Sequence, residues 1–267
     1  MNITHVFTDI DGTLLDSEHR LTIRTKDVIA RLRAKGIRVI LVSARPPRGM
    51  GFIRDEAGAD SVMICCAGAL ILDGERIVVD KVMPQEVPER VAQLIAGTHV
   101  SLSLYRGMDW YTPGLDRFTR AEADIVRFLP RVMPQLAPAH EEAPADAGAN
   151  KIMLMSSARE IFFLYPQVQG ALKHLAAAAL SKPDYLEILP LGVNKGSAVR
   201  DYCLKEGIDP AKIAAAGDQD VDLGMLEFAG LGIAMGNATE HVKAVADMIT
   251  RSNDEDGLAL ALEELLL

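Results

Sequence analysis

Two aspartates one residue apart follow a short apolar run near the start of the chain. Val6 and Phe7 precede Asp9 and Asp11, and Gly12 comes directly after them. A strand here would deliver both carboxylates to the carboxyl edge of a sheet, where open α/β sheets bind ligands. Asp is a poor strand former and like charges repel, so an acidic turn that only caps the backbone explains the pair poorly. Such a loop can hold a hard cation on oxygen ligands while one carboxylate attacks an electrophile.

Three further segments repeat the pattern of an apolar run or helix start with polar residues at its tip. They are residues 41–45 with Ser43, residues 194–197 with Lys195, and residues 216–222 with Asp218. Together they supply an oxygen nucleophile, metal ligands and donors for phosphoryl oxygens, which is what phosphoryl transfer requires. The alternatives are a helix cap at Asp218 and a solvated lysine at Lys195. An ammonium at a helix start opposes the helix dipole, however, so a structural role explains Lys195 poorly.

Composition excludes several classes of protein. The chain has 267 residues, of which 49% are hydrophobic, so it can bury one large α/β domain or two smaller ones. Its 28 basic and 37 acidic residues give a formal charge of -9, which argues against nucleic acid or an anionic membrane as the main partner. The longest apolar stretch, residues 62–72, is too short to span a bilayer, and the first residues do not resemble a signal peptide.

The cysteines and histidines give no sign of a disulfide framework or a zinc site. Cys65, Cys66 and Cys203 are odd in number and two of them are adjacent, so we expect reduced core thiols in a cytoplasmic protein. The six histidines lack metal-ligand spacing.

Apolar periodicity predicts strands and helices in alternation. Thr22 can cap a helix that buries Val28, Ile29 and Leu32, and residues 37–42 and 62–66 are typical of buried parallel strands. The same alternation returns after residue 195, with a helix over 195–206, strands over 213–216 and 231–234, and a final helix to the end of the chain.

The middle of the chain has a different character. Residues 70–82 and 100–111 alternate like strands joined by hairpin turns, residues 137–150 suggest a solvated loop, and we expect a helix over about 161–179 and a strand over 185–189. The sequence thus predicts an α/β fold: a Rossmann-like parallel sheet with helices on both faces, formed by residues 1–82 and 187–267, and an inserted α+β cap over 83–186.

The four segments in this order resemble the motifs of the haloacid dehalogenase-like superfamily. The segments YLEILPLGVNKGSA at 185–198 and SNDEDG at 252–257 resemble its Cof-type phosphatases, which carry a type IIB cap. The resemblance covers the chain from end to end, and four ordered motifs are far more specific than one.

The resemblance implies a role for each aspartate of the first loop. Asp9 would be the nucleophile, forming an aspartyl-phosphate while its other oxygen binds Mg²⁺. Asp11 would protonate the leaving oxygen and then activate water, with its backbone carbonyl on the metal. A carboxyl that first acts as an acid needs a raised pKa, so we expect the crowded acidic pocket to raise the pKa of Asp11.

The resemblance also assigns the other segments. Ser43 and the backbone amides of Ala44 and Ile10 would bind the phosphoryl oxygens, and Lys195 would counter the charge of Asp9 and phosphate. Asp218 would be a further Mg²⁺ ligand, and Asp222 would orient the metal shell through water or Lys195.

Three positions depart from the family pattern, with Val221 and Ala67 where asparagine is usual and Ala44 where glycine is usual. Val221 removes an expected amide donor near the phosphate, and the other two alter the pocket wall, so rate, affinity or substrate choice can differ from the family norm. None of the three replaces the nucleophile, the acid, the lysine or a metal carboxylate.

The resemblance implies a Mg²⁺-dependent phosphatase acting on a small phosphate ester, such as a sugar phosphate. Two alternatives stay open: a phosphomutase or phosphotransferase, and a ligand-binding protein of this fold with impaired catalysis. Arg45, Arg106 and Asp109 are candidates for substrate contact. Neither the substrate nor the oligomeric state follows from the sequence.

Overall fold

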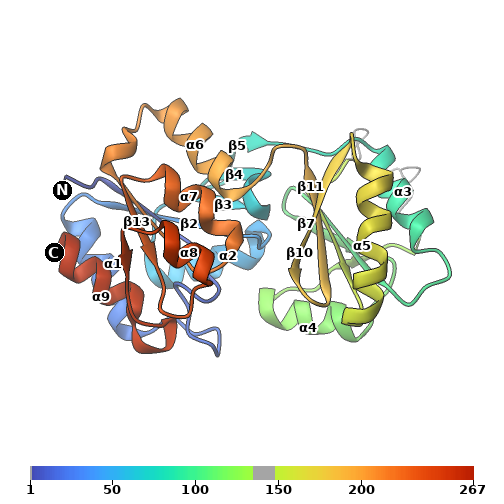
Figure 1. Ribbon diagram of the computed structural model, residues 1–267, viewed down its shortest axis with the longest axis horizontal. Coiled ribbons are helices and arrows are strands. Elements are labelled where there is room, and N and C mark those ends of the chain that lie inside the picture. The colour runs from blue at the N-terminus through green and yellow to red at the C-terminus, as the bar shows by residue number, and fades with distance from the viewer. Residues whose placement is uncertain (1, 135–147) are drawn as a thin grey trace. The chain divides into compact units, whose positions relative to one another are not determined.

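The chain folds into two compact units. The computed structural model describes residues 2–134 and 148–267. The first unit consists of Met1–Arg45, Met50–Val78 and Asn194–Leu267, and the second of Pro46–Gly49 and Val79–Val193. Figure 1 shows that each unit contains a sheet with helices packed on it. The first unit is therefore discontinuous in sequence, with the second inserted between its parts.

The first unit is built on an eight-stranded sheet. Its strands are arranged in the order β14-β13-β12-β1-β2-β3-β4-β5. Neighbours from β14 to β3 are parallel, and β4 runs antiparallel to β3. The strand bounds are β1 (His5–Thr8), β2 (Arg38–Val42), β3 (Val62–Cys65), β4 (Leu70–Asp73), β5 (Arg76–Asp80), β12 (Ile213–Gly217), β13 (Leu231–Ala234) and β14 (Met248–Ile249).

The central strands of this sheet are buried, as their continuous apolar runs predict. Every residue of β12 is buried, as are Val6 to Thr8 of β1 and Val39 to Val42 of β2. In the register of the sheet, Thr8 pairs with Leu41 on one side and with Ala216 on the other. The residues that follow β1, β2 and β12 therefore emerge at one edge of the sheet.

The helices of the first unit form two groups. Helices α1 (Ile23–Ala34) and α9 (Gly257–Leu266) pack together, as do α6 (Lys195–Glu206) and α7 (Leu223–Phe228), and Figure 1 shows strands of the sheet running between the two groups. Helix α8 (Glu240–Val245) and most of α2 (Pro47–Ala57) complete the set. The predicted cap of α1 is confirmed, because the Thr22 side chain accepts a hydrogen bond from the amide of Thr25.

The second unit has a six-stranded sheet in the order β10-β11-β9-β6-β7-β8. Alternate residues of its strands pack against α3 (Glu86–Leu94) and α5 (Ala158–Leu172) in one apolar core, to which Val91, Leu104, Leu154 and Ile188 belong. The strands are β6 (Ser101–Arg106), β7 (Asp109–Thr112), β8 (Arg131–Val132), β9 (Lys151–Met155), β10 (Ala176–Lys182) and β11 (Tyr185–Pro190), and α4 (Arg117–Val126) lies between β7 and β8 in sequence.

One predicted element is wrong. The helix expected over 161–179 ends at Leu172, and Ala176 to Ala179 form part of β10. Alanine favours helix, but here Ala176 pairs with Pro190 and Ala179 with Glu187 of β11, and this pairing outweighs local propensity. The loop expected over 137–150 lies for the most part outside the described residues.

The turn after β3 holds a backbone conformation that alanine adopts at a cost. Ala67 has φ 53° and ψ 24°, in the left-handed region, and it is buried. Because this conformation costs about 1–2 kcal/mol for a residue with a Cβ, while glycine gains about 0.4–1 kcal/mol of unfolded-chain entropy, we expect Ala67→Gly to raise the free energy of unfolding by about 0.5–1 kcal/mol. Chemical denaturation measures the difference.

Ala69 provides the matched control for this prediction. It lies two residues away, is buried, and has helical angles of φ -69° and ψ -24°. Ala69→Gly removes no strain, so it should lower the free energy of unfolding by about 0.5–1 kcal/mol. Equal losses for both variants would show that Ala67 is not strained.

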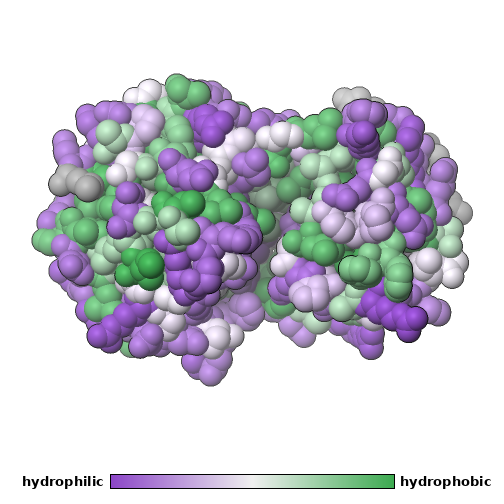
Figure 2. Space-filling view, in the orientation of Figure 1, coloured by the Kyte–Doolittle hydropathy of each residue, from purple (hydrophilic) through white to green (hydrophobic). Residues whose placement is uncertain are grey.

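Polar and charged side chains cover much of the surface shown in Figure 2, with smaller apolar patches between them. None of the helices in residues 2–134 and 148–267 has the length and apolar character needed to cross a membrane. Cys65, Cys66 and Cys203 are buried, as expected of core thiols, and no two of them form a disulfide.

Candidate active site

The sheet register brings the predicted motifs of the first unit to one edge. Asp9 directly follows β1, and its amide donates to the carbonyl of Ala216 in β12. Asp218 follows β12, and Ser43 follows β2 on the other side of β1. Lys195 comes to the same place as the first residue of α6. Segments separated by more than 180 residues in sequence thus meet around Asp9.

Lys195 joins two aspartates at the centre of the site. Its Nζ atom lies 2.6 Å from Asp9 Oδ1 and 2.6 Å from Asp222 Oδ1. All three residues are buried, with 4% or less of each exposed. The solvated-lysine alternative is therefore wrong, because this ammonium is desolvated and held by two carboxylates.

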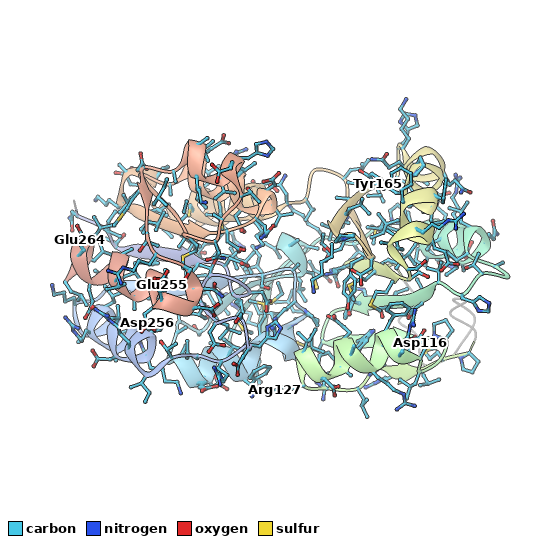
Figure 3. All side chains as sticks on the ribbon, turned by 60° about the horizontal axis from the view of Figure 1, so that its bottom comes forward. Asp116, Arg127, Tyr165, Glu255, Asp256 and Glu264 are labelled. Atoms are coloured by element: carbon cyan, nitrogen blue, oxygen red, sulfur yellow. The ribbon has the colours of Figure 1, made fainter. Side chains whose placement is uncertain are left out.

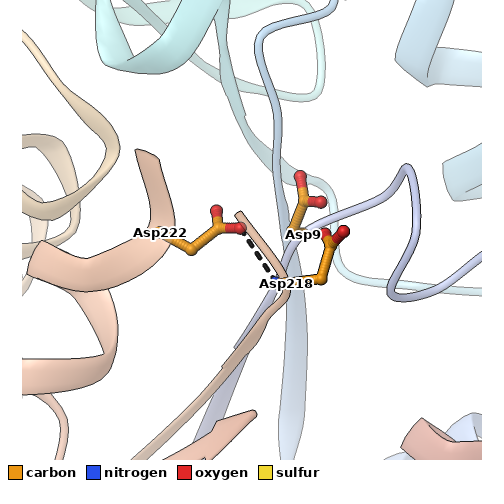
Figure 4. A group of neighbouring side chains, drawn as sticks. All are labelled: Asp9, Asp218 and Asp222. Atoms are coloured by element: carbon orange, nitrogen blue, oxygen red, sulfur yellow. Dashed lines mark hydrogen bonds between the residues drawn. The ribbon is translucent and has the colours of Figure 1, made fainter. Parts of the chain in front are cut away.

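The second oxygen of Asp222 is also occupied. It accepts hydrogen bonds from the amides of Asp218 (3.1 Å) and Gln219 (3.0 Å). Figure 4 shows the carboxylate of Asp222 turned toward the backbone at Asp218, while the carboxylates of Asp9 and Asp218 lie side by side. Asp222 therefore fixes the Asp218 turn and the Lys195 ammonium, and both of its oxygens are bound by protein donors.

The Asp218 carboxylate lies against the loop that follows β1. Thr13 Oγ1 donates to Oδ1 at 3.3 Å, and Gln219 Nε2 donates to Oδ2 at 2.7 Å. Gly12 has φ 82°, and a Cβ atom there would come within 2.5 Å of Asp218 Oδ2. Only glycine lets the backbone approach this carboxylate so closely.

The donor set fits a hard divalent cation. Asp9, Asp218 and Asp222 each offer a carboxylate oxygen within 4.8 Å of the others. Burial raises the pKa of Asp9 well above its ordinary value, Lys195 opposes this, and Asp222, Asp218 and Asp11 add to it. Burial likewise raises the pKa of Asp218. One lysine does not neutralise three buried carboxylates, so an oxygen-binding cation would relieve their repulsion.

Asp11 departs from the expected electrostatics. Arg45 donates to both of its oxygens, from Nε at 2.7 Å and from a terminal nitrogen at 2.6 Å, and His19 Nδ1 lies 3.0 Å from Oδ1. Burial acts to raise the pKa of Asp11, but the hydrogen bonds and charges of Arg45 and His19 outweigh it and hold the pKa below its usual range. The expected raised pKa is wrong, because two basic side chains rather than the acidic pocket surround this carboxyl.

The candidate phosphate-binding residues lie in the turns after β1 and β2. Ser43 is buried, and its Oγ accepts a hydrogen bond from the amide of Arg45 at 3.1 Å. Ile10 is fully buried directly after Asp9, and Ala44 follows Ser43. The backbone of this second turn is held by the amide of Ala67, which donates to the Ser43 carbonyl.

The candidate substrate contacts in the second unit form ion pairs within that unit. Arg106 donates to both oxygens of Asp80, at 2.9 and 2.8 Å. Asp109 pairs with Arg131 at 3.2 Å and accepts a hydrogen bond from the Tyr111 hydroxyl. Arg106 and Asp109 therefore do not pair with each other, because each forms an ion pair with another residue.

Sequence reasoning missed three residues of the site. Gln219 and His19 contact Asp218 and Asp11 as described, and Asn237 Nδ2 donates to the Gly12 carbonyl at 2.9 Å. Gln219 lies inside a recognised motif, so its amide was a visible candidate to replace the one absent at Val221. His19 and Asn237 are brought in by loops, and nothing in their spacing indicates a role.

Comparison with known proteins gives the family of the chain. Residues 6–262 match the family model for haloacid dehalogenase-like hydrolases. A Haemophilus influenzae relative is 33% identical over 265 residues, with 97% of each chain covered. A 5-amino-6-(5-phospho-D-ribitylamino)uracil phosphatase of Bacillus subtilis, YwtE, is 29% identical, with 97% of this chain and 96% of that protein covered.

A solved structure extends the agreement to the whole fold. A haloacid dehalogenase-like hydrolase from Bacteroides thetaiotaomicron superposes with a TM-score of 0.91 at 28% identity, with 99% of this chain and 100% of that chain covered. The family match, the fold and the ordered motifs agree, and the chain belongs to the haloacid dehalogenase-like hydrolases.

Proposed function

We propose that the protein is a Mg²⁺-dependent phosphatase that hydrolyses a small phosphorylated metabolite through an aspartyl-phosphate at Asp9. The observation that carries the proposal is the buried cluster in which Lys195 joins Asp9 to Asp222 while Asp218 lies beside them. A helix cap or a turn would not require three buried carboxylates and a buried ammonium, because burying each of these charged groups costs desolvation energy. The YwtE relative, whose name gives a phosphorylated metabolite as its substrate, supports the choice of substrate class.

In this proposal Asp9 attacks phosphorus and the ester oxygen leaves. Lys195 holds Asp9 Oδ1, so the carboxylate is oriented and its charge is offset when the anionic phosphate arrives. Ser43 and the backbone of Ile10 and Ala44 donate to the phosphoryl oxygens. Asp9 and Asp218 with the carbonyl of Asp11 would hold Mg²⁺, which supplies positive charge against the developing negative charge on the phosphoryl group.

Asp11 has two tasks in this proposal, as an acid toward the leaving oxygen and then as a base toward water. The hydrogen bonds from Arg45 and His19 keep Asp11 ionised and lower its pKa, so in this paired state it can neither donate a proton nor remove one efficiently from water. Proton donation to the leaving oxygen requires Asp11 to leave Arg45 first.

We further propose that Val79–Val193 acts as a cap that selects the substrate. We also propose that the enzyme works in the cytoplasm, where its three thiols stay reduced.

The test is phosphate release from a panel of sugar phosphates, phosphorylated cofactor precursors and nucleotides. We expect turnover of at least one ester with Mg²⁺, and a loss of at least about a hundredfold after treatment with EDTA, because the carboxylates then repel the phosphoryl group. Re-addition of Mg²⁺ should restore the rate, and Ca²⁺ at the same concentration is the control. Analysis of the products separates the alternatives, since a phosphomutase gives an isomerised ester without free phosphate.

A further inference from the structure

Asn237 reaches two segments of the candidate active site at once. It follows β13 in a short turn, and its Nδ2 atom lies 2.9 Å from the Gly12 carbonyl oxygen and 3.5 Å from Asp218 Oδ2. Gly12 belongs to the loop that carries Asp9 and Asp11. One amide group therefore spans the gap between the two carboxylate-bearing segments.

The side-chain amide of Asn237 is itself held by a hydrogen bond to its oxygen. Its Oδ1 atom accepts a hydrogen bond from the backbone amide of Asn253 at 3.0 Å, which fixes which end of the side chain points toward Gly12. The neighbouring Gly236 amide donates to the carbonyl of Arg251, and a Cβ atom at Gly236 would come within 2.7 Å of the Ser252 nitrogen. The turn at Gly236 and the chain at Arg251 and Ser252 thus pack backbone to backbone.

The segment Ser252–Gly257 also forms direct hydrogen bonds to the loop after β1. Asn253 Nδ2 donates to the Leu15 carbonyl at 3.0 Å, and Asp254 Oδ1 accepts from the amide of Ser17 at 2.8 Å. At the other end, Asp256 Oδ1 accepts from Thr22 Oγ1 at 2.6 Å.

These contacts account for a motif that the proposed chemistry leaves unused. Figure 3 shows Glu255 and Asp256 at the beginning of α9, yet Asp256 makes no side-chain capping bond to that helix. Its carboxylate accepts a hydrogen bond from Thr22 instead. The side chains of Asn253, Asp254 and Asp256 therefore bind the chain between Leu15 and Thr22 and not the helix that follows them.

We propose that Asn237, held by Asn253, is a positioning residue that sets the affinity of the site for Mg²⁺. It would orient the Asp218 carboxylate and keep the Asp11–Ser17 loop at the distance that the cation requires. Together with Gln219 it supplies amide donors beside Asp218 in a chain that has Val221 where the family usually has asparagine. This inference rests on the proposed function, because it presupposes that the site binds Mg²⁺.

The test measures Mg²⁺ binding alone, without substrate, by isothermal titration calorimetry of the metal-free protein. We expect Asn237→Ala to weaken Mg²⁺ binding about tenfold, the effect typical of removing a group that orients a metal ligand. Asn253→Ala loses only the bond to Leu15 and should give a smaller change, about twofold to threefold.

The control is His241→Ala, which removes an exposed side chain of α8 that pairs with Asp220. It should bind Mg²⁺ as the wild type does. The melting temperature of Asn237→Ala in EDTA should lie within a few degrees of the wild-type value, because the side chain is exposed and its substitution changes stability only slightly.

Two results would overturn the inference, and they differ. If the wild type binds Mg²⁺ and Asn237→Ala binds it equally well, Asn237 has no positioning role and the proposed function stands. If the wild type gives no binding heat at millimolar Mg²⁺, and EDTA does not affect turnover, the metal requirement of the proposed function fails and this inference fails with it.

Discussion

Replacing Asp9 by asparagine is expected to abolish phosphate release. The amide cannot form an acyl phosphate, and loss of an enzyme nucleophile typically lowers kcat by about 10⁴ to 10⁶, so we expect a fall of at least about a thousandfold. The measurement is phosphate release with saturating Mg²⁺ on the best ester of the panel.

The same variant should not lose stability. Burial and the neighbouring carboxylates raise the pKa of Asp9, so the ionised side chain is costly in the folded protein. The asparagine oxygen can still accept a hydrogen bond from Lys195. We therefore expect an unchanged or higher melting temperature, which separates loss of the nucleophile from loss of the fold. Turnover within tenfold of the wild type would exclude Asp9 as the nucleophile.

Replacing Lys195 by methionine is expected to affect both stability and activity. The ammonium is buried between Asp9 and Asp222, and removing one member of a buried charge cluster typically costs about 3–5 kcal/mol. We expect a loss of that size in the free energy of unfolding from chemical denaturation, and a fall in phosphate release of at least about a hundredfold.

The stability loss should depend on pH with a defined sign. The pKa of Asp9 is raised above its ordinary value by burial, even with Lys195 opposing it, and removing Lys195 raises it further. The folded variant then binds more protons than the unfolded chain, so its free energy of unfolding rises as pH falls. The deficit relative to the wild type should be largest at alkaline pH and should shrink as the pH falls toward the ordinary pKa of a carboxyl group.

Lys205→Met is the matched control on the same helix. Lys205 is exposed near the end of α6, and its Nζ atom lies 3.4 Å from the Val78 carbonyl oxygen. It should change the free energy of unfolding by less than about 0.5 kcal/mol, as exposed substitutions usually do. If Lys195→Met were equally harmless at every pH, the buried ion pairs would have no role in stability.

Local patterns predicted much of the first unit. Helix α6 has the bounds 195–206 expected from the sequence, and strand β12 begins at Ile213 as predicted. These elements have strong local signals: a capping asparagine at 194, continuous apolar strands, and glycine at the helix end. The strand at Ala176 to Ala179 was missed because its pairing partner, and not its own composition, determines its conformation.

The candidate site also has a part that the sequence predicted and a part that it did not. The superfamily resemblance drawn from Asp9, Ser43, Lys195 and Asp218 is confirmed by the family match, while the individual roles of these residues stay predictions. Their motifs are short runs with fixed internal spacing, so the order of motifs is visible in the sequence. The pKa of Asp11 was predicted in the wrong direction, because Arg45 and His19 approach it from other loops.

The sequence by itself determined the residue types that can carry the chemistry and the strands that deliver them, because carboxylates after buried strands are a local pattern. Only the tertiary structure decided which partner each charge has: Lys195 between Asp9 and Asp222, Arg45 on Asp11, and Asn237 on Gly12. The physical reason is that a charge responds to every group within a few ångströms, whatever its distance in sequence. Asp9 and Asp11, one residue apart, therefore have pKa values displaced in opposite directions.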